Sequence, residues 1–106
     1  MKILLDECLP VDFRLRFPQH ETHTAEWAGL KSLSNGALLK AAEEAGYDVL
    51  LTVDQGLPHQ NNFTGRRIAV VAIRARTNQL EDLVPLVDRI LESLMTIRPG
   101  EVMRVS

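Results

Sequence analysis

The sequence predicts a single α/β domain, residues 1–106, in which helices flank a mostly parallel sheet of about four to five strands. Three short runs, residues 2–5, 49–53 and 68–73, are apolar except for Lys2 and Thr52, as expected of strands buried on both faces. Helical patterns separate these runs, and strands that alternate with helices form βαβ units. At 106 residues the chain is long enough to bury a core without disulfides or a structural metal.

The first half of the chain begins with the strand of residues 2–5. A helix then starts at Pro10, because the missing N–H of proline costs nothing in a first turn, and it ends near Pro18. The apolar residues of this helix are Val11, Phe13, Leu15 and Phe17. Residues 20–25 predict a second, more polar strand, and residues 27–30 predict a turn.

The clearest helix follows Ser34, a good N-cap residue, and stops at Gly46. Its apolar stripe consists of Ala37, Leu38, Ala41, Ala42 and Ala45. The strand of residues 49–53 comes next and leads to Asp54. Residues 55–65 are polar and contain several Gly, Pro and Asn, which predicts a surface loop.

A long helix is predicted after the third apolar strand. Asn78 and Glu81 have the spacing of a capping box, and the helical pattern continues to about Met95. Pro85 should kink or restart this helix, because proline lacks the N–H that the helix interior needs. A Pro-Gly turn then leads to a last strand, residues 102–105.

Composition limits the classes of function. The chain is 45% hydrophobic and 25% charged, which is ordinary for a soluble globular domain. No apolar run approaches the ~20 residues that span a bilayer, and the first residues do not resemble a signal peptide. A single cysteine fits a reducing compartment, so we expect a cytoplasmic protein with no membrane partner. The net charge of -2 means that any nucleic acid must be bound by a local basic cluster.

Charged residues follow the predicted strands. Asp6, Asp54 and Arg74 come at the ends of three of them, and the carboxyl ends of parallel strands form one rim of a sheet. Two carboxylates on such a rim suit Mg²⁺ or Mn²⁺, which could orient a phosphodiester and activate water. The alternative is that each aspartate only hydrogen-bonds its own turn. A third interpretation is a domain in which one of these aspartates accepts a phosphoryl group. Such a domain would need a lysine at the end of a later strand, where this chain has Arg74.

Arginines near the rim are candidate phosphate ligands. Arg74 and Arg76 follow the third apolar strand, and Arg66 and Arg67 precede it. The sequence leaves open whether these side chains contact phosphate groups or are simply solvated. Glu7 is not expected to share the cation with Asp6, because adjacent side chains point in different directions.

Other candidate residues fit structural roles better. His20 and His23 are three residues apart, whereas a zinc-protease motif needs four, and on a strand they face opposite sides. The two carboxylates beside Cys8 should raise its pKa, so we expect a small, partly buried residue rather than a nucleophile. His59 could approach the rim, although loop histidines are usually solvated. We expect Trp27 to pack rather than to stack on a base.

Three segments are similar to a known family. The opening, MKILLDECLP, resembles the MKILLDENLP-type opening of the small stand-alone PIN-like proteins of bacteria. HETHTAEWAGLKSLSNGALLKAAEEAGYDVLLTVD resembles that family's strand, Gly-Leu turn, serine-initiated helix, apolar strand and Thr-x-Asp motif. RIAVVAIRAR resembles its next strand, which ends in arginine. The likeness covers nearly the whole chain, but only the opening is fairly specific.

The resemblance implies a three-layer PIN-like domain related to the VapC-type ribonuclease toxins of toxin–antitoxin pairs. In such proteins, clustered acids bind Mg²⁺ or Mn²⁺, and RNA is hydrolysed. Asp6 matches the first acid of the family and Asp54 matches the acid of Thr-x-Asp. The resemblance also implies RNA and a cognate antitoxin protein as partners, and a homodimer as the assembly.

The chain departs from the family pattern at three positions. Asn35 and Gly56 stand where the family usually has aspartates, and Cys8 replaces an asparagine. Glu43 or Glu44 could substitute for a missing acid, although neither matches a family position. Two hypotheses follow: a toxin-like, metal-dependent ribonuclease, or a catalytically degenerate domain that acts by binding protein or RNA.

Overall fold

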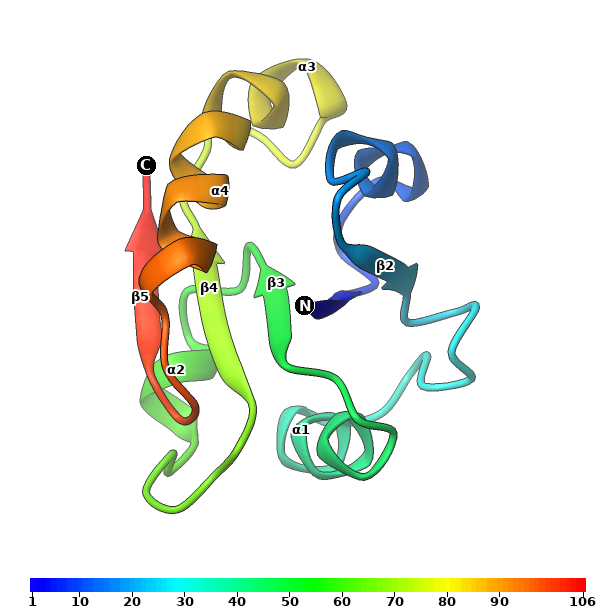
Figure 1. Cartoon of the computed structure of the whole chain (residues 1–106). Coiled ribbons are helices and arrows are strands. Elements are labelled where there is room, and N and C mark those ends of the chain that lie inside the picture. The colour runs from blue at the N-terminus through cyan, green and yellow to red at the C-terminus, as the bar shows by residue number, and fades with distance from the viewer.

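The computed structural model describes residues 1–106 as an α/β domain with a five-stranded sheet (Figure 1). The strands are β1 Lys2–Leu5, β2 Glu21–Thr24, β3 Val49–Thr52, β4 Ala69–Ile73 and β5 Val102–Val105. Their order is β2-β1-β3-β4-β5, and every neighbouring pair is parallel. The predicted fold class is confirmed, and the sheet is parallel throughout rather than mostly parallel.

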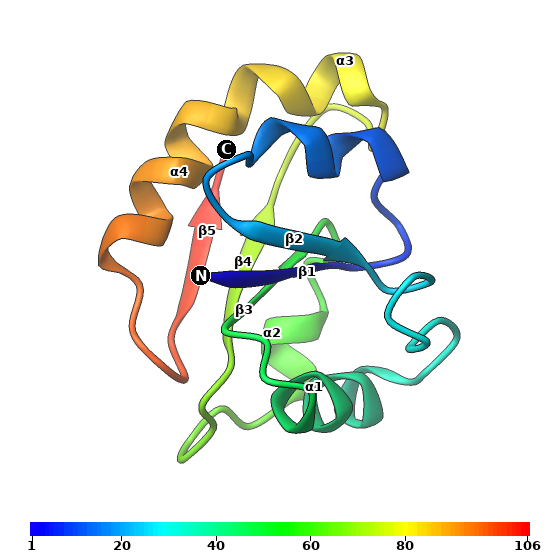
Figure 2. The same cartoon turned by 45° about the vertical axis from the view of Figure 1, so that its right-hand side comes forward.

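Helices cover both faces of the sheet. They are η1 Val11–Arg16, α1 Asn35–Glu44, α2 Leu57–Gln60, α3 Leu80–Leu83, η2 Val84–Leu86 and α4 Val87–Thr96. The first helix and the α3–η2–α4 segment lie on one face, and α1 and α2 lie on the other (Figure 2). The strands turn progressively from β2 to β5, as the right-handed twist of strands requires.

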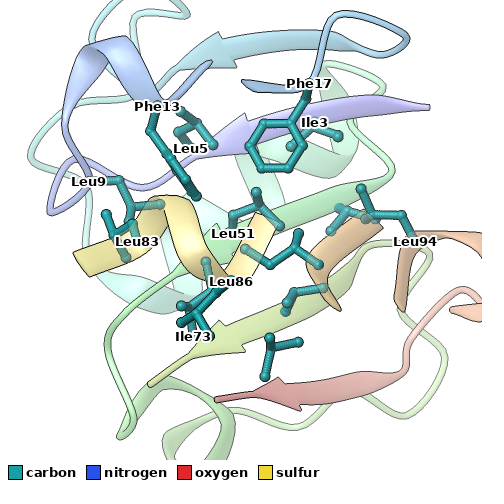
Figure 3. Close-up of a cluster of buried hydrophobic side chains, with 14 of the residues drawn as sticks. Ile3, Leu5, Leu9, Phe13, Phe17, Leu51, Ile73, Leu83, Leu86 and Leu94 are labelled. Atoms are coloured by element: carbon teal, nitrogen blue, oxygen red, sulfur yellow. The ribbon is translucent and has the colours of Figure 1, made fainter. Parts of the chain in front are cut away.

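Alternate residues of the inner strands β1, β3 and β4 enter two separate cores. Ile3 and Leu5 of β1 lie in the larger core, together with Phe13 of η1, Phe17 directly after it and the α3–η2–α4 segment (Figure 3). Leu4 of β1 lies in the smaller core with residues of α1 and α2. Because helices cover both faces of the inner strands β1, β3 and β4, most positions of these strands are apolar, which explains the nearly continuous apolar runs.

The predicted ends of α1 agree with the structure. Ser34 is the N-cap residue, and Gly46 follows the helix with a positive φ of 84°. This left-handed conformation is one that glycine adopts without a steric penalty. The first predicted helix is also present, as a 3-10 helix that ends before Pro18.

The predicted surface loop of residues 55–65 is wrong in part. Residues Leu57–Gln60 form α2, and the side chain of Leu57 is fully buried in the smaller core. This one apolar side chain among polar neighbours anchors a turn of helix that composition alone does not predict.

The predicted capping box is also wrong. Gln79, not Asn78, is the N-cap residue of α3, and the hydroxyl of Thr77 accepts the backbone N–H of Gln79 at 3.0 Å. Asn78 instead donates its amide N–H to the carbonyl oxygen of Cys8 at 2.9 Å. Pro85 lies in η2, where the helix tightens and restarts as predicted. None of the helices combines the length and the apolar character that crossing a membrane requires.

Candidate functional site

The candidate site lies at the carboxyl ends of β1 and β3, which are neighbouring inner strands of the sheet. From β1 the chain connects to β2 on one side, and β3 lies on the other side. In open parallel sheets of this order, ligands bind at such a switch point. Asp6 directly follows β1, and Asp54 lies two residues after Thr52, the last residue of β3.

Thr52 connects the two aspartates. Its hydroxyl donates a hydrogen bond to Oδ2 of Asp6 at 2.7 Å and accepts the backbone N–H of Asp54 at 3.0 Å. Thr52 is the one polar residue of the chain that is classed as buried. A buried hydroxyl needs such partners, because an unpaired one would cost free energy. The predicted convergence of Asp6 and Asp54 on one rim therefore has a specific physical link.

Each aspartate also makes a local hydrogen bond. Oδ1 of Asp6 accepts the N–H of Glu7 at 2.9 Å, and Oδ1 of Asp54 accepts the N–H of Gly56 at 2.9 Å. These are the turn contacts that a purely structural aspartate would make. Each of these hydrogen bonds occupies one lone pair of the accepting Oδ1 atom, so both carboxylates can still accept hydrogen bonds from a ligand or coordinate a cation.

Two amide side chains complete the rim. Nδ2 of Asn35, the first residue of α1, lies 3.4 Å from Oδ2 of Asp54 and 3.2 Å from Oε1 of Gln60. Position 35 is therefore next to Asp54 even though it lacks the expected carboxylate. Gln60 was not a sequence candidate, since its helix α2 was predicted as a loop.

The donors at this rim are all hard oxygen atoms. They are the carboxylates of Asp6 and Asp54 and the amide oxygen of Gln60, whereas Asn35 presents its amide nitrogen to Asp54 and Gln60. No group of three or more His, Cys, Asp or Glu side chains that could hold a metal ion is present. Two carboxylates fit Mg²⁺, which keeps several waters and takes few protein ligands. They do not form the larger acid cluster that the family resemblance implies.

Arg74 and Arg76 lie beyond the end of β4, where they are exposed. Neither guanidinium forms an ion pair or a side-chain hydrogen bond within the protein. Gln55 joins the ends of β3 and β4, because its side-chain amide donates to the carbonyl oxygens of Ile73 and Val53 at 2.8 and 3.3 Å. Because neither guanidinium has a partner within the protein, Arg74 and Arg76 are free to contact a phosphate at this end of the sheet.

Arg66 and Arg67 serve a different purpose. They precede β4, at the amino ends of the strands, and both contact Glu43 near the end of α1. Nη1 of Arg66 lies 2.7 Å from Oε1 of Glu43, and the backbone N–H of Arg67 donates to Oε2 at 2.9 Å. Glu43 therefore does not supply a third acid to the rim. Burial opposes its ionisation, but these hydrogen bonds and the two guanidinium charges outweigh burial and lower the pKa of Glu43.

The remaining sequence candidates have other neighbours. Oε2 of Glu7 accepts the N–H of Ser32 at 3.1 Å and so holds the loop before α1 against the rim. Burial, followed by the charge of Asp6, raises the pKa of the Cys8 thiol, in the predicted direction. His59 accepts a hydrogen bond from Arg104 of β5 at 3.3 Å rather than contacting the aspartates. Glu44 is exposed on α1.

Comparison with protein-family models, with curated proteins and with solved structures gives no match. The similarity to PIN-like proteins stays a prediction from the motifs quoted above.

Proposed function

We propose that this protein hydrolyses RNA phosphodiesters with the help of Mg²⁺ or Mn²⁺ at the rim between β1 and β3. One observation carries the proposal: the buried hydroxyl of Thr52 joins the carboxylate of Asp6 to the backbone of Asp54. This contact presents two acids from distant parts of the chain at the switch point of a parallel sheet. RNA as the substrate rests on the resemblance to PIN-like ribonucleases.

The residues of the rim have distinct roles in this proposal. Asp6 and Asp54 would hold the cation, with the amide oxygen of Gln60 as a neighbouring donor. When bound, such a cation stabilises charge on phosphate oxygens and lowers the pKa of water. Arg74 and Arg76 would contact phosphates of the RNA backbone and so fix its position.

RNA cleavage in the presence of Mg²⁺ or Mn²⁺ tests the proposal. We expect Asp6→Asn and Asp54→Asn each to reduce the cleavage rate on the order of a hundredfold, because each removes a charged ligand. Asp88→Asn, on the exposed side of α4, is the matched control and should cleave like the wild type. Equal activity in all four proteins would point to a contaminating nuclease and refute the assignment.

A second candidate function is binding without catalysis. The amide nitrogen of Asn35 faces Asp54 at the position where the resembled family carries an aspartate. This contact satisfies Asp54 without a cation, as expected of a degenerate site that retains only protein or RNA binding. No cleavage by the wild type, together with retained RNA binding, would favour this candidate.

We further propose a toxin-like role, with a cognate antitoxin protein as partner and a homodimer as the assembly. Growth arrest on expression of the wild type, relieved by Asp54→Asn, is the cellular result that this role requires. Arrest that persists with Asp54→Asn would contradict it.

A further inference from the structure

A groove of about 540 Å³, lined by more polar than hydrophobic residues, lies along the outer side of β2. Val11 and Arg14 of η1 form one wall, and His23 and Thr24 of β2 with Trp27 of the following turn form the other. β2 is an edge strand that pairs only with β1, so this side of the sheet is not covered by another strand. The aspartates of the rim do not line the groove.

Trp27 is the most distinctive residue of the groove. We expected it to pack, but 71% of its surface is exposed. One face of its indole stacks on the ring of His23, with centroids 4.0 Å apart and an angle of 30° between the planes. Because so much of the side chain is exposed, its other face is open to solvent.

The ring of His23, on which Trp27 stacks, is held in place by its neighbours. Nδ1 of His23 forms a hydrogen bond of 2.8 Å with the hydroxyl of Tyr47, and Nε2 lies 3.7 Å from Oε2 of Glu21. The backbone N–H of Trp27 donates to the hydroxyl of Thr24 at 3.1 Å. An aromatic side chain held in place in this way loses little conformational freedom when a flat ligand stacks on it.

The groove contains one cation that is available to the phosphate of a ligand. The guanidinium of Arg14 has no ion-pair or hydrogen-bonding partner within the protein. Glu26, the acid of the groove, lies 4.0 Å from Nζ of Lys31, so its charge is partly offset. A flat stacking surface next to an unpaired cation is how proteins hold single-stranded nucleic acid. A groove for an apolar peptide would instead be lined mainly by hydrophobic side chains.

The groove adjoins the rim through the ends of β1 and β2. Leu5 and Thr24 are partners in the sheet, and the N–H of Ala25 donates to the carbonyl oxygen of Leu5 at 2.9 Å. The turn that carries Trp27 therefore leaves the sheet at the end where Asp6 follows β1 (Figure 2). A strand of RNA across the rim can reach Trp27 without crossing the sheet.

From this arrangement we infer that Trp27 and Arg14 form a subsite for an unpaired nucleotide of single-stranded RNA. The base stacks on the open face of Trp27, and a phosphate contacts the guanidinium of Arg14. The nucleic acid bound in the groove is therefore single-stranded. That it is RNA rests on the proposed function.

Trp27 is the only tryptophan of the chain, so its fluorescence reports directly on the groove. The probe is a single-stranded oligoadenylate of about ten nucleotides, long enough for a site of this kind. Chelator is present, so that no cleavage can occur. We expect the oligonucleotide to quench the emission of wild-type Trp27, and a duplex RNA of equal length to quench it much less.

Variants are compared by the anisotropy of a labelled oligonucleotide. Trp27→Ala should weaken binding roughly tenfold, since stacking on an aromatic side chain is lost, whereas Trp27→Phe should bind within roughly threefold of the wild type. Arg14→Gln should weaken binding and reduce the salt slope by about 0.7, the contribution of one phosphate contact to a single strand. Glu26→Gln should strengthen binding. Met95→Ala, an exposed apolar residue on α4, is the control.

The absence of quenching by the single strand, or unchanged affinity in Trp27→Ala, would overturn the inference. A wild type that sediments as a dimer, becomes monomeric in Trp27→Ala and binds no oligonucleotide would assign the groove to a second copy of the chain. A wild type that shows quenching by the oligonucleotide but does not cleave RNA with Mg²⁺ or Mn²⁺ would refute only the proposed catalysis, because binding is measured without a cation. Cleavage without quenching would refute only the groove.

Discussion

Thr52 determines the geometry of the candidate site at the scale of single residues. Its buried hydroxyl contacts the side chain of one aspartate and the backbone of the other, although these residues are far apart in the sequence. The sequence predicted the two acids because each follows an apolar strand. It singled out Thr52 only as part of the Thr-x-Asp motif, since nothing in the sequence indicates which hydroxyl is buried between two acids.

Glu43 provides a test of electrostatics away from the rim. The side chain is only 13% exposed and is bound by Arg66 and by the backbone of Arg67. We expect Glu43→Gln to lower the free energy of unfolding by about 1–3 kcal/mol near neutral pH, because hydrogen bonds to a charged group are lost. Glu44→Gln, the exposed neighbour, should change it by less than about 0.5 kcal/mol.

The pH dependence of this difference follows from the lowered pKa of Glu43. A carboxyl group with a lower pKa in the folded state stabilises the fold above its unfolded pKa, and this stabilisation is lost as the pH falls. The difference between wild type and Glu43→Gln, measured by urea denaturation, should therefore shrink below the ordinary glutamate pKa of 4.5. A difference independent of pH would mean that the ion pair contributes nothing.

The local surroundings of a residue were harder to predict than its position along a strand. The sequence leaves Glu43 and His59 open as members of the rim, but Glu43 lies at the far end of α1 and His59 contacts β5. Asn35 was noted only as a departure from a family pattern, yet it is adjacent to Asp54. These contacts depend on how helices pack on the sheet, which periodicity does not reveal.

Among the secondary structure elements, α2 contributes most to the site beyond the strands. Gln60 at its end contacts Asn35, while Leu57 at its start is buried in the smaller core. The helix has only four residues, so it is held in place by this burial rather than by its own hydrogen bonds. Packing of a single leucine therefore positions one side of the rim.

Substitution of Leu57 tests this role. Leu57→Ala should lower the free energy of unfolding by about 2–5 kcal/mol, because it leaves a cavity in a packed core. The matched control is Leu15→Ala on η1, where the leucine is 60% exposed and the cost should stay below about 1 kcal/mol. Equal small effects of both substitutions in thermal or urea unfolding would show that α2 is not anchored by Leu57.

Most of the elements that the sequence predicted correctly carry a clear signal. Apolar runs marked β1, β3 and β4, Ser34 and Gly46 marked the two ends of α1, and Pro85 marked the restart of the last helix, whereas the polar strand β2 has no such signal. The errors arose where signals were weak or competed. The position of α2 depends on one buried leucine, Leu57. The side chain of Asn78 donates a tertiary hydrogen bond to Cys8 instead of capping a helix.

At the scale of the whole molecule, the strand order explains why distant residues meet. β1 and β3 are neighbours although one strand, β2, and two helices, η1 and α1, separate them in the sequence, and these two helices cover opposite faces. This arrangement brings Asp6 and the Asp54 turn to one rim and places the Trp27 turn beside it. The same rim has two acids rather than a cluster, which makes cation binding the decisive property.

Titration with Mn²⁺, followed by calorimetry, tests the central claim that this rim binds a divalent cation. We expect the wild type to bind Mn²⁺ at millimolar concentration or tighter, and Asp54→Asn to lose the binding. Asn35→Asp should strengthen it roughly tenfold, because it adds a carboxylate next to Asp54, about 1.4 kcal/mol of affinity. Identical titrations of all three proteins, or no binding by any of them, would contradict the account.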